Sequence, residues 1–545
     1  MSEVMLKAKS PFVSLLQLLQ GSQSLYDIVA ACYHIIFVYQ HDHELEFINE
    51  IDKLADKGSK NNACFNDLEQ FRTKMDFLIS DVYDESETLL FLNELCELLS
   101  HLTCPPRTEK NTFVSFCAFY IIEVIDFYLE SGLLNGKSKF PDCGPLNKNV
   151  CVEKCCVYFH ETDSFLSNIY RSGRNGFRKP LHGFRLGSIF RRLLMFERIE
   201  FVASPPRIVP VFMTDSDKQQ FKLDHRLRIA SIPFIGDRTF DFYEVKNNKP
   251  CEGAPDGAFY VRYNECKESK CIQAMIQLLD KAIENKTHIV VFPEYVMSPG
   301  MLDAIRKYLR EKYFGTKQPG NQLLLVLAGT NYVYDDSGTG NNIMHILVGD
   351  GHEIGRYYKY SPFLTQCRET VHGGIYGETV DYDKRRYLHN LEIISNQGGE
   401  CTLIDLNGVG RILPSICRDV IDGNYTDTLA KLFAPSLLLI PAWSASTTSF
   451  NSRLSVLAET IHTTSLLCNC CNAVDEKKHT IGKFVYPTKQ DSEMVARIMP
   501  LNRECSYKKE CINVGGCMHL VDLDFGGSEL NVSQKNILVD MSKHV

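Results

Sequence analysis

Three residues with chemically useful side chains, Glu294, Lys359 and Cys417, come at or near the ends of short strand-like stretches in this sequence. Glu294 closely follows the apolar run 289–292, and Cys417 ends the mostly apolar run 409–417. In open α/β folds, ligands and catalytic groups gather at the carboxyl ends of strands. A thiol with a pKa of about 8.5 is mostly protonated at neutral pH, so a neighbouring carboxylate can act as its base. A lysine can stabilise the oxyanion that forms when the sulfur attacks an amide or nitrile carbon.

Each of these side chains has a simpler interpretation when it is considered alone. A single lysine such as Lys359 is usually a solvated surface residue, and a single cysteine in an apolar run is usually a packed core residue. Most of the 21 cysteines have no setting that would make them nucleophiles. The chemical hypothesis therefore depends on the three residues occurring together, each at the end of an element.

The elements around these residues alternate between strand and helix patterns. A helix is predicted directly after Glu294, because Ser298 is a candidate N-cap and Pro299 suits the first helical position. Asn407-Gly408 is a preferred two-residue hairpin turn and predicts that residues 401–406 pair with the run that ends at Cys417. Further strands are predicted at 227–234, 323–328 and 343–348, and a further helix at 272–283. This alternation favours an α/β layered fold.

The order Phe-Pro-Glu294, Tyr-Tyr-Lys359 and Ser-Ile-Cys417-Arg-Asp resembles the carbon–nitrogen hydrolase (nitrilase) superfamily, over about residues 225–490. The resemblance implies a nitrilase-like αββα sandwich with a Glu-Lys-Cys triad. It also implies the roles: a cysteine nucleophile, a glutamate base, a lysine that stabilises the oxyanion, and a thioester intermediate.

The sequence departs from the family pattern next to the nucleophile. Arg418 stands where the family usually has an aromatic residue, and Asp419 matches a common acidic position. We predict that Arg418, Asp419 and Trp443 line the substrate pocket, with Arg418 favouring an anionic substrate group. Many family members have a second glutamate, for which Glu369 is the first candidate and Glu378 the second.

An insertion at about 372–399 makes the interval between Lys359 and Cys417 longer than is usual for the family. This insertion is rich in glycine, tyrosine and charged residues. It is interpreted as a lid or a partner-binding loop.

Length and composition indicate an ordinary multidomain globular protein. The chain has 545 residues, 44% of them hydrophobic and 23% charged, and roughly two to four domains are expected at this length. A net charge of −8 argues against wholesale nucleic-acid binding. The first ten residues do not resemble a secretory signal, so we expect a cytoplasmic protein with reduced cysteines. The apolar segment 112–129 contains two acidic residues and is interpreted as a buried helix rather than a membrane span.

The predicted helices and strands, together with the changes in composition, divide the chain into four regions. We predict an all-α helical domain at 1–165 for a partner or for oligomerisation, a basic linker region at 166–222, a catalytic domain at 223–490 and a C-terminal extension at 491–545. Within the linker, Arg171–Arg198 interleaves arginines with phenylalanines. Such a run could follow a nucleic-acid backbone, but a linker leading to a solvated helix is favoured because no recognised nucleic-acid module surrounds it.

Two groups of cysteines could in principle bind a zinc ion. Both lack paired C-x-x-C spacing, so we predict no metal site and no cofactor. The members of these groups are Cys143, Cys151, Cys155, Cys156 and His160, and then Cys505, Cys511 and Cys517.

The sequence leaves three functional hypotheses. The first is a hydrolase that acts on the non-peptide C–N bond of a small amide or nitrile and forms homo-oligomers through the surfaces of its nitrilase-like fold. The second is a nitrilase-fold assembly or sensor component of a multi-protein system, for example in bacterial antiviral defence, that binds a protein or nucleic acid through residues 1–165 or Arg171–Arg198. The third is an ammonia-transferring amidase, which is least favoured because no G-x-x-x-x-G-K-[ST] motif is present.

Overall fold

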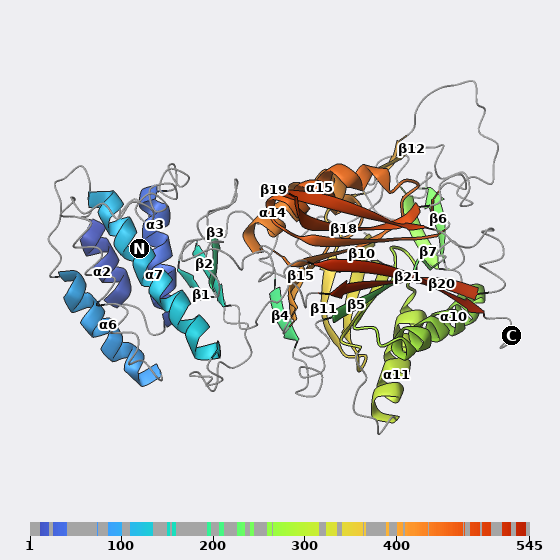
Figure 1. Ribbon diagram of the computed structural model, residues 1–545, viewed down its shortest axis with the longest axis horizontal. Helices are drawn as coiled ribbons and strands as arrows, with labels where there is room; N and C mark the ends of the chain where they lie inside the picture. Colours follow the sequence, from blue (N-terminus) through green and yellow to red (C-terminus); the bar gives the residue numbers. More distant parts are fainter. Residues whose placement is uncertain are drawn as a thin grey trace. The chain divides into compact units, whose positions relative to one another are not determined.

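The structure of the protein is a computed structural model in which the chain forms two compact units (Figure 1). The first unit comprises Met1–Glu161, Gly173–Val202 and Lys431–Phe433, and the second comprises Thr162–Ser172, Ala203–Ala430 and Ala434–Val545. The structure describes residues 11–20, 25–40, 74, 85–100, 110–134, 150–152, 155–159, 193–197, 207–211, 226–234, 240–244, 259–263, 265–315, 323–334, 340–362, 364–366, 389–391, 400–406, 409–433, 435–471, 473–474, 480–490, 493–502, 515–524 and 530–540.

The described part of the first unit contains helices and one small antiparallel sheet. The helices are α2 (Pro11–Gln20), α3 (Leu25–Gln40), α6 (Glu85–Ser100) and α7 (Lys110–Leu134). Helix α3 packs against α2 and α7, with buried apolar residues that include Ile28, Cys32 and Ile35. Spacing at three and four residues brings such side chains onto one face of a helix, as the sequence pattern predicted.

The expectation of an all-α region at 1–165 is wrong for its last part. Strands β1 (Val150–Val152), β2 (Cys155–Phe159) and β3 (Leu193–Glu197) form a three-stranded antiparallel sheet in the order β1-β2-β3. Their valine, tyrosine and phenylalanine residues have a high β-propensity. The strands were missed because each is too short to show a clear alternation. Most of Arg171–Arg198 lies outside the described residues.

The first large sheet of the second unit has seven strands in the order β11-β10-β9-β8-β5-β20-β21. Its central strands, β5, β8 and β9, pair in parallel, while the other neighbouring strands pair antiparallel. The strands are β5 (Arg226–Ser231), β8 (Ile289–Val291), β9 (Leu325–Tyr334), β10 (Gly340–Val348), β11 (Glu353–Tyr358), β20 (Gly515–Asp524) and β21 (Asn531–Asp540).

The second large sheet also has seven strands, in the order β19-β18-β17-β16-β15-β14-β4. The antiparallel pair β14 and β15 confirms the predicted pairing of these two segments. The predicted two-residue turn is wrong, because Leu406 lies opposite Gly410 and three positions separate them. The strands are β4 (Arg207–Val211), β14 (Thr402–Leu406), β15 (Gly410–Pro414), β16 (Leu437–Ala442), β17 (Thr464–Asn469), β18 (Thr480–Gln490) and β19 (Glu493–Asn502). Two smaller sheets pair β6 (Phe240–Glu244) with β7 (Phe259–Tyr263) and β12 (Leu364–Gln366) with β13 (His389–Leu391).

Helices cover the two large sheets, which lie between them in Figure 1. Helices α10 (Glu265–Glu284) and α11 (Pro299–Gly315) pack together beside the first sheet, and their apolar residues share one buried cluster with β8 and β20. Helix α14 (Asn424–Phe433) and helix α15 (Asn451–Thr460) lie on the side of the second sheet, where α15 contacts β18 and β19. The alternating pattern thus predicted the layered α/β class correctly.

Some strands of the large sheets come from outside the segment 223–490. Strand β4 pairs in parallel with β14 although we expected a linker there, and β20 and β21 lie in the expected C-terminal extension. The sequence pattern missed β4 because it is only five residues long and contains Pro210, which is tolerated on an edge strand.

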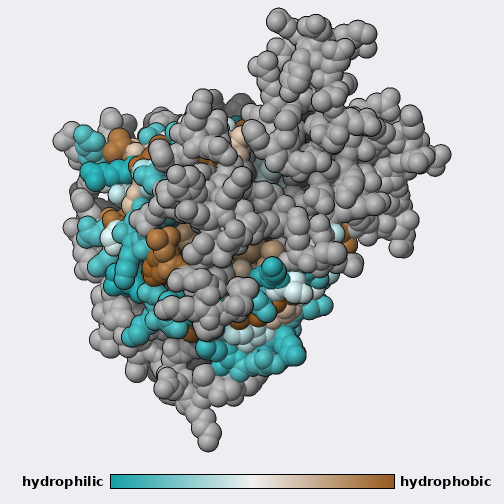
Figure 2. All heavy atoms as spheres, turned by 90° about the vertical axis from the view of Figure 1, so that its right-hand side faces the viewer, coloured by the Kyte–Doolittle hydropathy of each residue, from teal (hydrophilic) through white to brown (hydrophobic). Residues whose placement is uncertain are grey.

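Among the described residues, no helix is both long enough and apolar enough to cross a membrane. The interpretation of 112–129 as part of a packed helix agrees with α7, whose residues from Phe113 to Ile122 are buried. On the face shown in Figure 2, the coloured surface is largely hydrophilic, with apolar residues in small groups.

Candidate active site

Glu294 lies in a tight turn that follows strand β8. The next residue, Tyr295, has a positive φ of 59°, and its backbone N–H donates to Thr330 Oγ1 at 2.8 Å. Gly329 in β9 has a φ of +74°, and a Cβ at this position would lie 2.5 Å from the carbonyl oxygen of Pro293. The turn therefore needs a glycine opposite it, because a side chain there would push the turn away from β9.

Nitrogen donors from three residues form hydrogen bonds with the buried carboxylate of Glu294. Lys359 Nζ lies 2.7 Å from Oε1, Asn342 Nδ2 donates to the same oxygen at 2.9 Å, and the backbone N–H of Trp443 donates to Oε2 at 3.0 Å. Glu294 is 1% exposed. A carboxylate this deeply buried requires such charged and polar partners, because its desolvation is otherwise very costly. These contacts fix the position of both oxygens.

Lys359 directly follows strand β11 and is also buried. Its backbone N–H donates to the carbonyl oxygen of Asn342 at 2.9 Å, so Lys359 still lies beside β10 after β11 has ended. Its Nζ lies over the ring of Tyr295, 5.6 Å from the ring centre, and pairs with Glu294. Lys359 is therefore not the solvated surface lysine that is most common for this residue type.

Cys417 lies between the end of β15 and the start of α13 (Arg418–Asp422). Its φ of 40° and ψ of −98° are unusual for a residue with a side chain, and its backbone N–H donates to the carbonyl oxygen of Pro441 at 3.0 Å. Such a conformation costs on the order of 1–3 kcal/mol and occurs preferentially at functional sites. The thiol lies 4.0 Å from the carbonyl oxygen of Trp443.

Burial raises the pKa of the Cys417 thiol well above its ordinary value. The negative charge of Glu294 and a hydrogen bond with that carboxylate also raise it, whereas the positive charge of Lys359 and the backbone contact with Trp443 lower it. The thiol is therefore protonated at rest, and Glu294 is the neighbouring base that can take its proton. This is the protonation state that the sequence analysis assumed.

The site joins the two large sheets of the second unit. The backbone N–H of Glu294, after β8, donates to the carbonyl oxygen of Ala442 at the end of β16. The thiol of Cys468 in β17 also donates to the carbonyl oxygen of Val291 in β8 at 3.2 Å. Glu294 and Lys359 thus come from one sheet and Cys417 from the other, and the contacts between sheets bring them together.

The three predicted pocket residues lie in different settings. Arg418 forms an ion pair with Asp422, with 2.6 Å between Nε and Oδ1, and its side chain is 33% exposed. The ring of Trp443 packs edge-on against Tyr295 with 6.5 Å between centres. Asp419 is fully buried and accepts hydrogen bonds from the segment around Lys359. Whether any of them lines a substrate pocket stays a prediction.

Sequence reasoning missed two asparagines that hold the site together. Asn342 contacts Glu294, and Asn469 accepts the backbone N–H of Ser444 at 2.9 Å and so supports the loop of Trp443. Both are buried polar residues in or beside apolar strands, which is the signal that could have identified them. The two candidates for a second glutamate, Glu369 and Glu378, lie outside the described residues.

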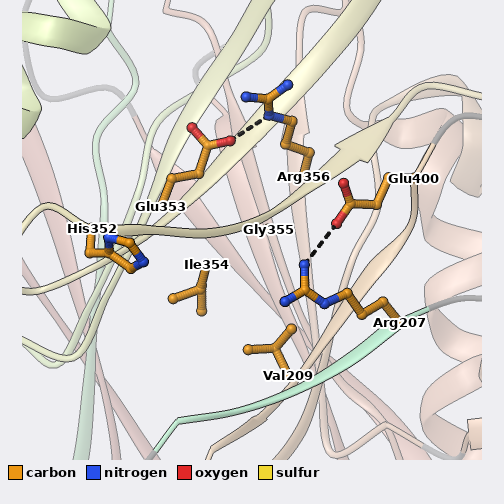
Figure 3. Close-up of a pocket in the computed structure, with 8 residues that line it drawn as sticks. All are labelled: Arg207, Val209, His352, Glu353, Ile354, Gly355, Arg356 and Glu400. Carbon is orange, nitrogen blue, oxygen red and sulfur yellow. Dashed lines mark hydrogen bonds and ion pairs between the residues drawn. The ribbon is translucent and has the colours of Figure 1, made fainter. Parts of the chain in front are cut away.

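A separate polar pocket lies where β11 approaches β4 and the start of β14, with a volume of about 320 Å³. Figure 3 shows Glu353 paired with Arg356 and Glu400 paired with Arg207 around it. None of Glu294, Lys359 and Cys417 lines this pocket. In the part of the chain that the structure describes, no group of three or more histidine, cysteine or acidic side chains is arranged to hold a metal ion.

This chain is similar to several solved structures of known proteins. No protein-family model and no curated protein matches the sequence. The similar structures include the glutamine-dependent NAD⁺ synthetase of Acinetobacter baumannii, with 14% identity, a TM-score of 0.32, and coverage of 58% of this chain and 49% of that chain. The chain thus spans about half the length of the synthetase.

Two further similar structures are nitrilase-type proteins that match over most of their own length. Nit3 of Saccharomyces cerevisiae, a member of the nitrilase superfamily, is 16% identical with a TM-score of 0.28, and the match covers 50% of this chain and 90% of that chain. The NitN amidase of Nesterenkonia sp. AN1 is 10% identical with a TM-score of 0.31 and coverage of 52% and 96%. These neighbours belong to the superfamily that the order of Glu294, Lys359 and Cys417 resembles.

Proposed function

We propose that this protein is a carbon–nitrogen hydrolase that cleaves a non-peptide amide or nitrile through a thioester on Cys417. The observation that supports this most directly is the setting of Glu294, whose buried carboxylate lies 2.7 Å from Lys359 Nζ. The charge of Glu294 also raises the pKa of the Cys417 thiol, so the carboxylate and the thiol are neighbours. A base, a cation and a nucleophile thus meet in one buried site. This combination matches the needs of nucleophilic attack on an acyl carbon.

In the first half-reaction on an amide, Glu294 takes the thiol proton while the Cys417 sulfur forms a bond to the carbonyl carbon. The negative charge that develops on the oxygen is stabilised by Lys359 and by the backbone N–H of Arg418, the first residue of α13. The C–N bond then breaks. Glu294 returns the proton to the departing nitrogen, so that ammonia or an amine leaves and the acyl group stays on sulfur as a thioester.

In the second half-reaction, water attacks the thioester carbon. Glu294 accepts the proton of the water while the new C–O bond forms, and Lys359 again stabilises the oxyanion. The C–S bond breaks, the thiolate recovers a proton from Glu294, and a carboxylic acid leaves. The resting state with a protonated thiol is restored, in agreement with the raised pKa of Cys417.

The finer structural expectations belong to the same proposal. They are a nitrilase-like αββα sandwich and a cytoplasmic homo-oligomer. The sandwich is supported by the sequence resemblance together with two sheets that lie between helices. The homo-oligomer is supported by the sequence resemblance alone.

The proposal is tested by measuring ammonia release from a panel of short aliphatic amides and nitriles, and by trapping the thioester with hydroxylamine. We expect Cys417→Ala to abolish both signals, and Glu294→Gln and Lys359→Ala to lower turnover at least a hundredfold, as is typical for general bases and oxyanion donors. Intact-protein mass spectrometry after acid quenching should show the acyl group only when Cys417 is present.

The matched control is Cys271→Ala, which removes a buried thiol of α10 that belongs to the apolar core beside the first sheet. This variant should keep its turnover. Turnover that survives in Cys417→Ala, or that is lost equally in Cys271→Ala, would contradict the assignment of the nucleophile.

A further inference from the structure

Asp419 accepts several hydrogen bonds from one segment of the chain. It is fully buried, in the second position of the short helix α13 that begins after Cys417. Its Oδ2 accepts a hydrogen bond from the hydroxyl of Tyr357 at 3.0 Å. The backbone N–H of Tyr360 lies 3.1 Å and 3.2 Å from its two oxygens, and the N–H of Ser361 also donates to Oδ1.

These donors lie on both sides of Lys359 in the chain. Tyr357 lies two residues before it, and Tyr360 and Ser361 directly follow it, so one carboxylate holds the segment at both ends. The backbone of Lys359 itself is held on the other side by the carbonyl oxygen of Asn342. Because Nζ must reach Glu294 within hydrogen-bond distance, a shift of this segment would move the cation away from the site.

We propose that Asp419 is a positioning residue that ties the segment carrying Lys359 to the helix that begins at Cys417. The role rests on the proposed function, since it is defined by the cation that assists Cys417. Asp419 acts on the reaction through Lys359. An ionised carboxylate suits the task, because it accepts several N–H and O–H donors at once.

The ionisation of Asp419 is set by its surroundings. Burial raises the pKa of Asp419, and the N–H donors of Ser361 and Tyr360, the charge of Lys359 and the hydroxyl of Tyr357 lower it. The net pKa is about 7. The titratable groups that face Asp419 are Tyr357 on β11, Lys359 after it, Cys401 before β14 and Tyr425 on α14. Burial raises the pKa values of Tyr357, Cys401 and Tyr425, so these groups stay neutral near pH 7.

The test is a double-mutant cycle in the full-length protein, with iodoacetamide as a small amide probe and peptide mass spectrometry to follow the alkylation of Cys417 at pH 8. Lys359→Ala should slow alkylation, because Lys359 lowers the pKa of the thiol. Asp419→Asn keeps the shape of the side chain but removes its charge. This substitution should slow the alkylation of Cys417 about tenfold, which corresponds to the free energy of one charge-assisted hydrogen bond. In the Lys359→Ala background, Asp419→Asn should have no further effect.

The pH dependence gives a readout that a purely structural role would not change. The ratio of the wild-type rate to the Asp419→Asn rate should be largest above pH 7 and should approach one below pH 6. The reason is that the wild-type carboxyl then carries a proton and resembles the amide. A ratio that does not depend on pH would contradict a role for the charge of Asp419.

Two milder measurements keep the test decisive if Asp419→Asn folds poorly. Tyr357→Phe removes a single donor to Asp419 and should slow alkylation in the same direction by a smaller factor, again only when Lys359 is present. Hydrogen exchange of the peptide containing Tyr360 and Ser361 should become faster in both variants. Asp522→Asn is the matched control, because this buried carboxylate pairs with Arg226 and Arg228 away from the site.

The outcomes separate the two proposals. If Lys359→Ala slows alkylation but Asp419→Asn slows it equally with and without Lys359, the positioning role is wrong and the proposed function stands. If Lys359→Ala leaves the alkylation of Cys417 unchanged, the proposed function fails and the role of Asp419 fails with it.

Discussion

At the scale of single residues, the site depends on the buried carboxylate of Glu294, which lies beside both the Lys359 ammonium and the Cys417 thiol. Glu294 must stay close to Lys359 and still be able to take a proton from Cys417. Asn342 and the backbone N–H of Trp443 occupy defined positions on its two oxygens and so hold it in place. Neutral donors do this without adding another charge to the pair, which keeps Glu294 available as a base.

We predict that Asn342→Asp shifts the acidic limb of the pH–rate profile to higher pH. The substitution places a second carboxylate within hydrogen-bond distance of Glu294, and two like charges raise the pKa of the pair. Below the raised pKa, Glu294 is protonated and cannot accept the thiol proton, so activity is lost there. The measurement is ammonia release as a function of pH.

Asn342→Ala is the control for this shift. It removes the donor to Glu294 without adding charge, so turnover should fall while the acidic limb stays closer to its wild-type position. An equal upward shift in both variants would show that charge repulsion is not the cause.

At the scale of elements, the turn after β8 and the strand β9 must approach each other closely. Gly329→Ala is expected to destabilise the protein by roughly 1–3 kcal/mol, since it combines a positive φ with a backbone clash against Pro293. It should also lower turnover, because the clash moves the turn that carries Glu294. Denaturant unfolding and ammonia release measure the two effects.

Gly300→Ala provides the comparison within the same region. The Cβ at this position would meet only the far end of the Glu268 side chain, and Gly300 has no positive φ in the structure. We expect a smaller loss of stability and little loss of turnover. Equal losses in the two variants would mean that backbone strain at Gly329 is not important.

Strand β10 contains a histidine that should make stability depend on pH. Burial, together with the charges of Arg356 and Arg306, lowers the pKa of His345 to about 3. An unfolded histidine binds a proton at about pH 6.5. The unfolded state therefore binds more protons between these values, and the free energy of unfolding falls as pH falls through this window, by at most about 1.4 kcal/mol per pH unit.

His345→Gln should flatten this dependence, as measured by denaturant unfolding between pH 7 and pH 4. His352→Gln is the matched control, because His352 is exposed. A slope that persists in His345→Gln would assign the effect to other groups.

At the scale of the whole molecule, the second unit is completed by residues far along the chain. Strand β20 pairs with β5, which is the neighbour of β8, and its buried residues Met518 and Leu520 belong to the same apolar cluster as Val290. The region that we expected to be an extension is thus part of the sheet that positions Glu294. The helices of the first unit contain no candidate catalytic residue.

We predict that deletion of residues 503–545 prevents the second unit from folding. The deletion exposes the edge of β5 and removes one side of the apolar cluster. Val521→Asp is the milder variant, since it places an unpaired charge at a fully buried position of β20. Circular dichroism and limited proteolysis should show loss of structure in both, while Lys535→Ala on the exposed side of β21 should behave like the wild type.

The sequence alone determined features that depend on nearby residues. The helix start at Ser298, whose hydroxyl accepts the N–H of Met301, and the hairpin between β14 and β15 follow from capping and turn chemistry within a few residues. The order of Glu294, Lys359 and Cys417 at the ends of strands also predicted the candidate site, because each has a recognisable local context.

Only the tertiary structure decided which residues surround these three. Asn342, Asn469 and Asp419 contact the site through pairings between segments that are 48, 25 and 59 positions apart in the chain, and no local pattern marks such partners. The five-residue strand β4 was missed for the same reason. A short strand is stabilised by the neighbour it pairs with, and that neighbour is fixed by the packing of the whole sheet rather than by its own residues.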